Sequence, residues 1–319
     1  MRGTVPARRG RLARVVDRSA ALAVLIVLVG TAVRLTVRDV SPMFAAVYYA
    51  LPWIVMAACL AFAGAAWMLV GRLRPGAAAV ALAAVFAGLW CSASYHSQPC
   101  RPGPDDVRVL LLNTARGRAG WDEVARALPP FDVDIIGLVE AGGKGPARQK
   151  FWEDNFPDHH VYLPGGGLAI LTRGDARRIN LHPLDGISRY LDAEIDLEGR
   201  LVRVLLVDLD ASPRFDKRGL IATVFRAASA TADVPTIVMG DFNTPIDSRW
   251  FDRVRTRFEH VFEAAGSGFF LTFPAQLPLV GIDHVWVSRG IEPRCATVES
   301  YGTSDHRALT ARLALSDQG

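Results

Sequence analysis

Polar side chains that could carry out hydrolysis follow several apolar runs of the sequence, at the points where strands would end. Asn113 and Glu140 each end such a run, and Asp241 and Asn243 follow another in the sequence GDFN. Residues at strand ends lie on loops that a rigid sheet holds in place, where binding and catalytic sites are usually built. These four side chains are therefore candidate site residues.

Two further pairs of an acid and a histidine occur nearer the C-terminus. Asp283 and His284 open the apolar run in GIDHVWVS, and Asp305 and His306 precede the last apolar run in SDHRAL. A histidine titrates near neutral pH and can activate water, and a carboxylate can orient it. The chain supplies candidates for both roles, whereas His284 is expected to be a structural residue of its strand.

The oxygen-bearing side chains of this set fit a hard cation. Magnesium prefers a few oxygen ligands and keeps several water molecules. Glu140 suits that role, and Asp305 or Asn113 would complete it. Magnesium is therefore the expected cofactor, with manganese as the alternative.

The order of these motifs resembles the endonuclease/exonuclease/phosphatase superfamily. A strand-terminal Asn and a strand-terminal Glu precede GDFN, IDHV and SDHR, and GLAILTR at 167–173 is similar to a strand in the middle of that family's domain. The resemblance covers residues 107–315 of 319. It implies an α/β four-layer sandwich of the DNase I-like class, here preceded by transmembrane helices, and a magnesium-dependent phosphoric ester hydrolase.

The resemblance also assigns roles to residues. Glu140 matches the metal-binding glutamate, Asn113 the asparagine beside it, and Asp305 an acid close to the metal. Asp241 and Asn243 match the pair that positions the nucleophile and the phosphate.

Two residues near the C-terminus complete the implied catalytic set. His306 matches a histidine that acts as a general base or contacts phosphate, and Asp283 matches the aspartate that hydrogen-bonds it. The implied reaction is in-line attack of a metal- and base-assisted water on a phosphodiester or phosphomonoester. Metal and amide groups would stabilise the charge on the phosphate oxygens.

One position departs from the family pattern. A second histidine usually follows the strand before the long helix, but this chain has VDLDASP there, with Asp208 at the expected place and Asp210 in the other register. Val139 also replaces a glutamine that usually precedes the glutamate. An ionised acid cannot donate to phosphate, so Asp208 alters the phosphate-binding site. Two functions stay open: an active phosphoesterase, or a catalytically weak or inactive relative that binds a phosphorylated ligand or a partner protein.

Three apolar stretches precede these motifs, at 19–33, 43–70 and 77–95, and the first reaches Val37 if Arg34 extends to the membrane interface. About 20 apolar residues span a bilayer, and no cleavage site of small residues follows the first stretch. We therefore predict three transmembrane helices and no signal peptide. The chain then divides into a basic cytoplasmic N-terminus (1–18), a membrane segment (19–95), a linker rich in Pro and Gly (96–106) and a catalytic domain (107–319).

Arginines are distributed unevenly around the apolar stretches. Those before the first stretch are Arg2, Arg8, Arg9, Arg11, Arg14 and Arg18. Arg72 and Arg74 lie between the second and the third. The positive-inside rule places the segments that carry these arginines in the cytoplasm. Three crossings then leave the catalytic domain on the opposite side of the cell membrane, outside the cytoplasm. Cys100 and Cys295 could pair in that oxidising location. A nucleic-acid-binding arm is the alternative role for the N-terminal arginines.

Strand-like and helix-like segments alternate after residue 106. Strands are expected at 107–112, 133–139, 168–172, 203–207, 236–239, 284–287 and 307–313, and helices at 121–128 and 214–230. Several short strands with few helices are typical of a layered α/β sandwich. We expect His159, His160 and His260 to be solvated loop residues.

The substrate is less well determined by the sequence. No basic stripe with interleaved aromatic residues occurs in the domain. Relatives of the superfamily cleave nucleic acids, lipid headgroups and small phosphoesters. The substrate therefore stays open between nucleic acid, phospholipid and a small phosphoester, and no protein partner is evident.

Overall fold

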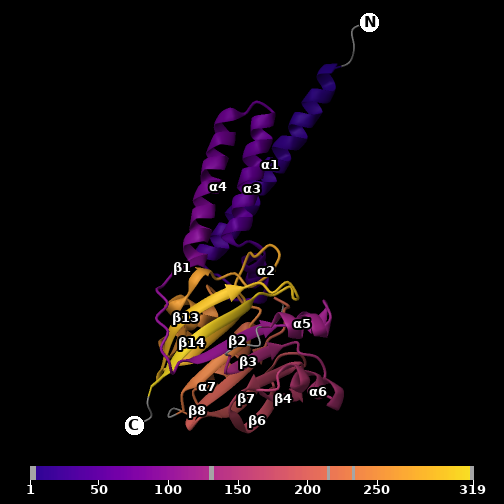
Figure 1. The fold of residues 1–319 in the computed structure, drawn as a ribbon. Coiled ribbons are helices and arrows are strands. Elements are labelled where there is room, and N and C mark those ends of the chain that lie inside the picture. The colour runs from indigo at the N-terminus through magenta and orange to yellow at the C-terminus, as the bar shows by residue number, and fades with distance from the viewer. Residues whose placement is uncertain (1–4, 129–132, 214–215, 232–233, 317–319) are drawn as a thin grey trace. The chain divides into compact units, whose positions relative to one another are not determined.

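The structure, a computed structural model, describes residues 5–128, 133–213, 216–231 and 234–316. The chain forms two compact units, Met1–Ser94 and Tyr95–Gly319. The first unit is helical, and the second is built on two large β-sheets (Figure 1).

The helices of the first unit provide two or three candidate membrane spans. They are α1 (Val5–Leu35), α2 (Pro42–Ala50), α3 (Trp53–Leu69) and α4 (Leu73–Ser94). Ala13–Leu35 and Leu73–Ser94 are each long and apolar enough to cross a membrane. The pair α2 and α3 would form a third span, although it is bent by 62°.

The uncharged stretch 43–70, predicted as one helix, is broken at Leu51 and Pro52. Proline has no N–H and disfavours helical backbone at the residue before it, so carbonyl groups of the last turn lose their helical partners. Arg34 bonds two of them: its Nε donates to Leu51 O at 2.9 Å and its Nη2 to Tyr48 O at 3.1 Å. Arg34 is therefore buried at this break and does not extend the first helix to Val37.

Two six-stranded sheets form the second unit. Sheet I has the order β13 (Ile291–Glu299), β14 (Ala308–Leu315), β2 (Val107–Asn113), β3 (Ile135–Val139), β5 (Leu168–Thr172), β4 (His160–Gly165). Sheet II has the order β10 (Phe258–His260), β12 (Asp283–Ser288), β9 (Thr236–Asp241), β8 (Arg200–Asp208), β7 (Arg189–Leu197), β6 (Asp175–Pro183). Short helical elements lie between strands along the chain: η1 (Ala115–Gly117), η2 (Arg249–Phe251), η3 (Val254–Thr256) and α8 (Val261–Ala265).

The two sheets pack face to face through one apolar core. Leu111 and Ile170 of sheet I share this core with Leu206 and Val285 of sheet II, and all four side chains are fully buried. The outer face of sheet I packs against α5 (Trp121–Ala127) and α6 (Pro146–Asn155), and the outer face of sheet II against α7 (Lys217–Ala228). These layers confirm the predicted four-layer α/β sandwich.

Central strands were recognisable in the sequence because both of their faces are buried. Such strands are continuous apolar runs, as in β3 and β5, whose residues are all buried. The polar strand β6 was missed because it lies at a sheet edge and is largely exposed. The helix predicted at 214–230 is α7, and Arg214 lies outside the described residues.

Each sheet contains one parallel pair of neighbouring strands. In sheet I, β2 and β3 are parallel and connected through α5; in sheet II, β8 and β9 are parallel and connected through α7. Carboxyl ends of parallel neighbours lie at the same edge of a sheet. This topology brings Asn113 near Glu140, and Asp208 near Asp241.

Residues 96–106, predicted as a linker, are bonded to the second unit. β1 (Tyr95–Ser97) pairs with β11 (Ser267–Phe269), and Arg101 N donates to Arg294 O at 3.2 Å. Cys100 and Cys295 form a disulfide, which confirms the pairing considered for them.

We expect the double variant Cys100→Ser/Cys295→Ser to lower the free energy of unfolding by about 2–4 kcal/mol. The disulfide joins residues 195 positions apart, and a long cross-link restricts the unfolded chain strongly. Chemical denaturation of the full chain in detergent, followed by tryptophan fluorescence, would measure the change. An unchanged midpoint would mean that the pairing of β1 with β11 already holds this segment.

Candidate active site

Asn113, at the end of β2, joins the two sheets. Its Nδ2 donates to Asp241 Oδ2 at 3.0 Å, and its Oδ1 accepts from Ala115 N at 2.9 Å. Ser304 Oγ donates to Asn113 O at 2.6 Å and accepts from His306 N at 3.0 Å. Through its side chain and its backbone carbonyl, Asn113 therefore connects the ends of β2 and β9 with the loop that precedes β14.

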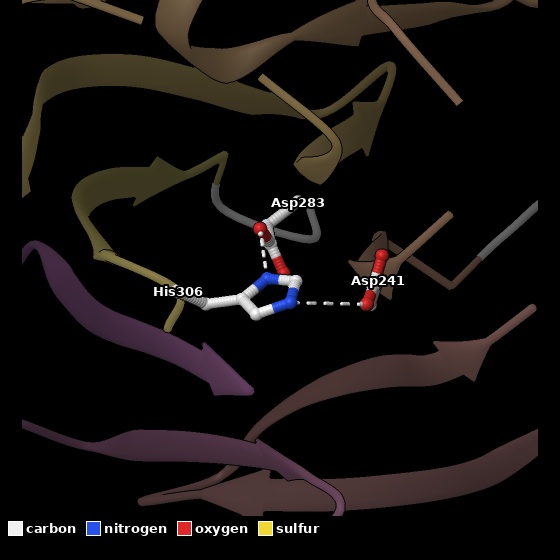
Figure 2. A group of neighbouring side chains, drawn as sticks. All are labelled: Asp241, Asp283 and His306. Atoms are coloured by element: carbon white, nitrogen blue, oxygen red, sulfur yellow. Dashed lines mark hydrogen bonds and ion pairs between the residues drawn. The ribbon is translucent and has the colours of Figure 1, made fainter. Parts of the chain in front are cut away.

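His306 lies between two carboxylates, Asp283 and Asp241 (Figure 2). Its Nδ1 is 2.8 Å from Asp283 Oδ2, and its Nε2 is 3.8 Å from Asp241 Oδ2. All three side chains are buried, and their ligand atoms lie within 4.8 Å of one another. The Phe273 ring packs against the imidazole, with 4.9 Å between ring centroids. These contacts fix the imidazole in what we call the Asp–Asp–His group.

Asp241 also lies in a row of three aspartates across sheet II. It pairs in register with Asp208 on β8 and with Asp283 on β12. Burial raises the pKa of Asp241 to about 8, and the charges of Asp283 and Asp208 act in the same direction. Like charges directly opposite each other destabilise a sheet, so this row favours a bound cation.

The carboxylates act on His306 in turn. Burial lowers the pKa of His306, but the charge and hydrogen bond of Asp283 and the charge of Asp241 outweigh burial and raise it to about 10. These interactions favour the protonated imidazole. A cation bound beside the carboxylates would oppose this effect and favour the neutral imidazole that a general base requires.

Glu140 follows β3 in an uncommon backbone conformation, with φ of 56°. Two hydrogen bonds hold this turn: Ala141 N donates to Gly167 O at 2.7 Å, and Thr114 Oγ1 donates to Glu140 O at 2.7 Å. Left-handed backbone at a residue other than Gly costs about 1–3 kcal/mol and persists where its surroundings fix it. The fold thus sets the position of this carboxylate.

Asn243 follows β9 and is also left-handed, with φ of 46°. Its backbone N donates to Asp241 Oδ1 at 2.8 Å, and its Nδ2 donates to Leu209 O at 2.8 Å. Asn tolerates this conformation better than most residues. The GDFN turn therefore attaches the loop after β8 to the end of β9.

The predicted metal ligands Glu140 and Asp305 lie outside the Asp–Asp–His group. Arg116 Nε is 3.4 Å from Glu140 Oε1, and Arg118 Nη1 is 3.2 Å from Asp305 Oδ2. Both arginines are largely exposed. The sequence-predicted residues therefore form a buried group at His306 and a more exposed pair of carboxylates.

Two sets of side chains could hold a cation. The oxygen ligands of Glu140, Asp305 and Asn113 fit magnesium. The ligand atoms of the Asp–Asp–His group lie within 4.8 Å of one another. An imidazole ligand suits a softer ion, and Asp283 already engages Nδ1 of His306. Asp283 Oδ1 is buried without a hydrogen bond in the described structure. A cation at the Asp–Asp–His group would satisfy this oxygen. The donor chemistry therefore fits a metal at this group, and the oxygen ligands of the other set also fit one.

The sequence profile of the endonuclease/exonuclease/phosphatase family matches residues 94–306. The chain belongs to this family. The match spans all the candidate site residues and leaves out nearly all of the helical first unit.

Solved structures share the fold. The mannosyl-6-phosphatase of Bacteroides thetaiotaomicron is 16% identical with a TM-score of 0.56, covering 66% of this chain and 100% of its own. D. rerio TDP2 in complex with a single-strand DNA product is 13% identical with a TM-score of 0.53, covering 66% of this chain and 99% of its own. Truncated Caenorhabditis elegans TDP2 is 18% identical with a TM-score of 0.55, covering 66% of this chain and 98% of its own. At these identities the likeness shows the DNase I-like fold alone. No curated protein matches the sequence significantly.

Asp208, the position at which the sequence analysis expected a histidine, lies at the end of β8 beside Asp241. Burial raises the pKa of Asp208 to about 6, and the charge of Glu140 acts in the same direction. The two carboxyl groups therefore interact although they belong to different sheets. Asp208 therefore lies beside Asp241, another candidate site residue.

The raised pKa of Asp208 has a consequence for stability. The folded chain binds the carboxyl proton of Asp208 more tightly than the unfolded chain, so ionisation of Asp208 lowers the free energy of unfolding. This loss of stability is absent below about pH 4, grows between about pH 4 and pH 6, and is complete above about pH 6. We expect Asp208→Asn to raise the free energy of unfolding by about 2–3 kcal/mol at pH 7 and to leave it unchanged near pH 3.5.

Denaturation with a chelator present, across this pH range, measures the effect. Asp158→Asn, at an exposed position, serves as the control. A gain at Asp208 that is independent of pH would contradict ionisation of the buried carboxyl group as its cause.

Lys217 is a cation near the site that the sequence analysis missed. It begins α7, its side chain is 2% exposed, and its Nζ donates to Asp210 O. Burial lowers the pKa of Lys217 to about 8, while the charges of Asp241 and other aspartates oppose this shift. Lysine at the start of a helix is usually solvated, so no signal in the sequence distinguishes this one.

The prediction of solvated histidines was wrong at two positions. His159 is buried, with Nε2 2.8 Å from Val133 O. His260 is buried, with Nε2 3.2 Å from His284 Nδ1, and burial lowers the pKa of His260 well below its usual value. His160 is exposed as predicted. His284 is a buried strand residue, as expected.

Proposed function

We propose that the chain is a membrane-anchored, divalent-metal-dependent phosphoric ester hydrolase. The buried Asp–Asp–His group carries this proposal, because the family's fold positions it where the ends of the two sheets meet. A histidine oriented by one carboxylate and facing another is suited to accept a proton from a nucleophile.

The residues take the following roles in the proposal. Asp283 holds His306 by its Nδ1, so Nε2 accepts the proton of an attacking water. Asp241 and Asn243 position that water and the phosphate. Other residues position the cation: Glu140, Asp305 and Asn113 would hold magnesium, which supplies charge stabilisation at the phosphate oxygens.

The proposed location is the cell membrane, with the catalytic domain outside the cytoplasm. The positive-inside rule places the N-terminus in the cytoplasm, and an odd number of spans puts the domain on the other side. The disulfide between Cys100 and Cys295 supports this orientation, because disulfides persist in oxidising compartments. It favours three spans over two, with α2 and α3 crossing together.

A reporter fusion at the C-terminus tests this topology. An alkaline phosphatase fused after residue 319 should be active in cells, because that enzyme needs an oxidising compartment to form its disulfides. An inactive fusion, together with an active cytoplasmic reporter at the same position, would place the domain inside.

Proposed substrates are phosphoesters: nucleic acid, a phospholipid headgroup or a small phosphoester. The similar structures include a phosphatase and a protein bound to a single-strand DNA product, which supports keeping both small phosphoesters and nucleic acid among the candidates. The assay uses the full chain in detergent with magnesium and a panel of plasmid DNA, an RNA oligomer, bis(4-nitrophenyl) phosphate and phospholipid vesicles. Magnesium-dependent turnover that His306→Ala abolishes would support the proposal, and the absence of turnover on all four would contradict it.

The second candidate is a catalytically weak or inactive relative that binds a phosphorylated ligand or a protein. Asp208 is the observation that favours it, because a carboxylate replaces a histidine that could donate to phosphate. If Asp208 merely damages the site, Asp208→His should raise turnover. Unchanged or lower turnover would show that Asp208 belongs to a working arrangement.

A further inference from the structure

The loop after β2 places two exposed arginines beside the proposed metal carboxylates. The side chains of Arg116 and Arg118 are 82% and 76% exposed, and each forms one ion pair, with Glu140 and Asp305 respectively. The Asp–Asp–His group, in contrast, is at most 8% exposed. The two guanidinium groups therefore lie at the solvent-facing rim of the proposed site.

The backbone of this loop is fixed. Ala115, Arg116 and Gly117 are consecutive left-handed residues, with φ of 49°, 55° and 66°. Gly117 N donates to Thr114 O at 3.0 Å, and Arg118 N donates to Ala115 O at 3.1 Å. A fixed loop presents its side chains at a lower entropic cost on binding than a mobile loop does.

Gly117 is required where the loop crosses an aromatic ring. A Cβ atom at this position would lie 2.4 Å from the Trp121 ring. Arg148 also stacks on Trp121, with its guanidinium carbon 4.0 Å from the centroid of the same ring. Trp121 therefore packs closely against the loop at Gly117.

The two arginines lie near different acidic residues of the candidate site. Burial and the charge of Glu140 raise the pKa of Asp208, and Arg116 opposes that rise, so its charge reaches the end of sheet II. Arg118 contacts Asp305 in the loop before β14. A substrate that enters the proposed site therefore meets two positive charges at this rim.

Neither ion pair prevents an arginine from binding a ligand. A guanidinium has five N–H donors, and each pair uses one nitrogen, Nε of Arg116 and Nη1 of Arg118. Exposed ion pairs contribute little to stability. Arginine binds phosphate oxygens through two parallel hydrogen bonds, which suits recognition of a phosphate group.

Building on the proposed phosphoesterase function, we propose that Arg116 and Arg118 determine specificity by binding a second phosphate group next to the scissile one. The scissile phosphate belongs with the buried group and Asn243, whereas exposed arginines reach the part of the substrate that extends outwards. The preferred substrate is then a phosphoester with at least two phosphate groups. Such a pair of phosphates occurs in an oligonucleotide and in a phosphorylated lipid headgroup.

The test compares matched substrates with the full chain in detergent and magnesium. One arm uses a thymidine dinucleotide with and without a 5′ phosphate, and the other uses glycerophosphoinositol with and without a ring phosphate at position 4. Bis(4-nitrophenyl) phosphate, with one phosphate, reports hydrolysis itself. We expect a higher kcat/KM for the doubly phosphorylated member of at least one arm, and the arm identifies the source of the second phosphate.

The variant Arg116→Gln/Arg118→Gln should remove this preference. Loss of both charged contacts should lower kcat/KM for the doubly phosphorylated member about a hundredfold, or about tenfold per arginine, and lower it less for its partner. Arg116→Lys/Arg118→Lys should keep part of the preference, because the charge remains without the fork geometry. Arg126→Gln is the control: Arg126 is also exposed, but its partner is Glu123 on α5.

The outcomes separate this inference from the proposed function. Hydrolysis of the one-phosphate reporter without preference in either arm would overturn the inference and leave the function standing. Preference that survives in the double Gln variant would also overturn it, because other groups would then bind the second phosphate. Hydrolysis of no substrate would overturn the function, and the inference would fall with it.

Discussion

His306→Ala should lower kcat for phosphoester hydrolysis about a thousandfold, within the range that a positioned general base contributes. His306 has an imidazole held by Asp283 at 2.8 Å, with Nε2 directed to Asp241 at 3.8 Å. Removing the ring removes the proton acceptor and leaves two buried carboxylates without their compensating charge. Steady-state kinetics on the best substrate of the panel, with circular dichroism to verify folding, would measure the effect.

Two comparisons make this prediction specific. His160→Ala changes an exposed histidine of β4 and should leave kcat unchanged. The double variant His306→Ala/Asp283→Asn should have a kcat within a small factor of that of His306→Ala alone. Residues that act as one unit have strongly non-additive effects. If the two losses multiplied, Asp283 would have a role separate from orienting the histidine.

Glu140→Gln should weaken magnesium binding by at least about 10–100-fold, the loss typical of removing even an outer partner of a metal ligand. Gln keeps the size of the side chain and the backbone conformation but removes the charge that a hard cation prefers. Calorimetry with magnesium, or electron paramagnetic resonance with manganese as the probe, would measure the affinity. Turnover at low magnesium should fall in parallel.

Glu140→Gln also distinguishes the two candidate cation sites. Its control is Glu123→Gln, which changes an exposed carboxylate paired with Arg126 and should leave the affinity unchanged. If Glu140→Gln bound magnesium normally while Asp283→Asn lost it, the cation would belong to the Asp–Asp–His group. That result would also remove the proposed role of Asp283 as a partner of the histidine alone.

The helical first unit shows which structural features a local sequence pattern can predict. Apolar runs without charge predicted the helices, because only length and composition are needed to recognise a segment that can span a bilayer. The bend of 62° between α2 and α3 and the hydrogen bonds of Arg34 to the broken turn were not predicted. The hydrogen bonds depend on Arg34, a side chain that is distant in sequence from Pro52.

The second unit gives the same contrast among strands. Strands buried on both faces, such as β3 and β5, were predicted because their residues are apolar throughout. β6, β7 and β13 were missed because strands that are partly exposed mix polar and apolar residues. The disulfide was considered from compartment chemistry, and the structure brings Cys100 and Cys295 together across 195 residues.

By itself, the sequence determined the types of the candidate site residues and their positions at strand ends: Asn113, Glu140, Asp208, Asp241, Asn243, Asp283, Asp305 and His306. These features are local, since an apolar run and the polar residue that ends it are adjacent in the chain. Strand register decided which of these residues meet, because pairing across β8, β9 and β12 places Asp208, Asp241 and Asp283 in one row. Burial of Lys217 and the position of Arg116 and Arg118 beside the carboxylates likewise depend on contacts between distant segments, which only the tertiary structure supplies.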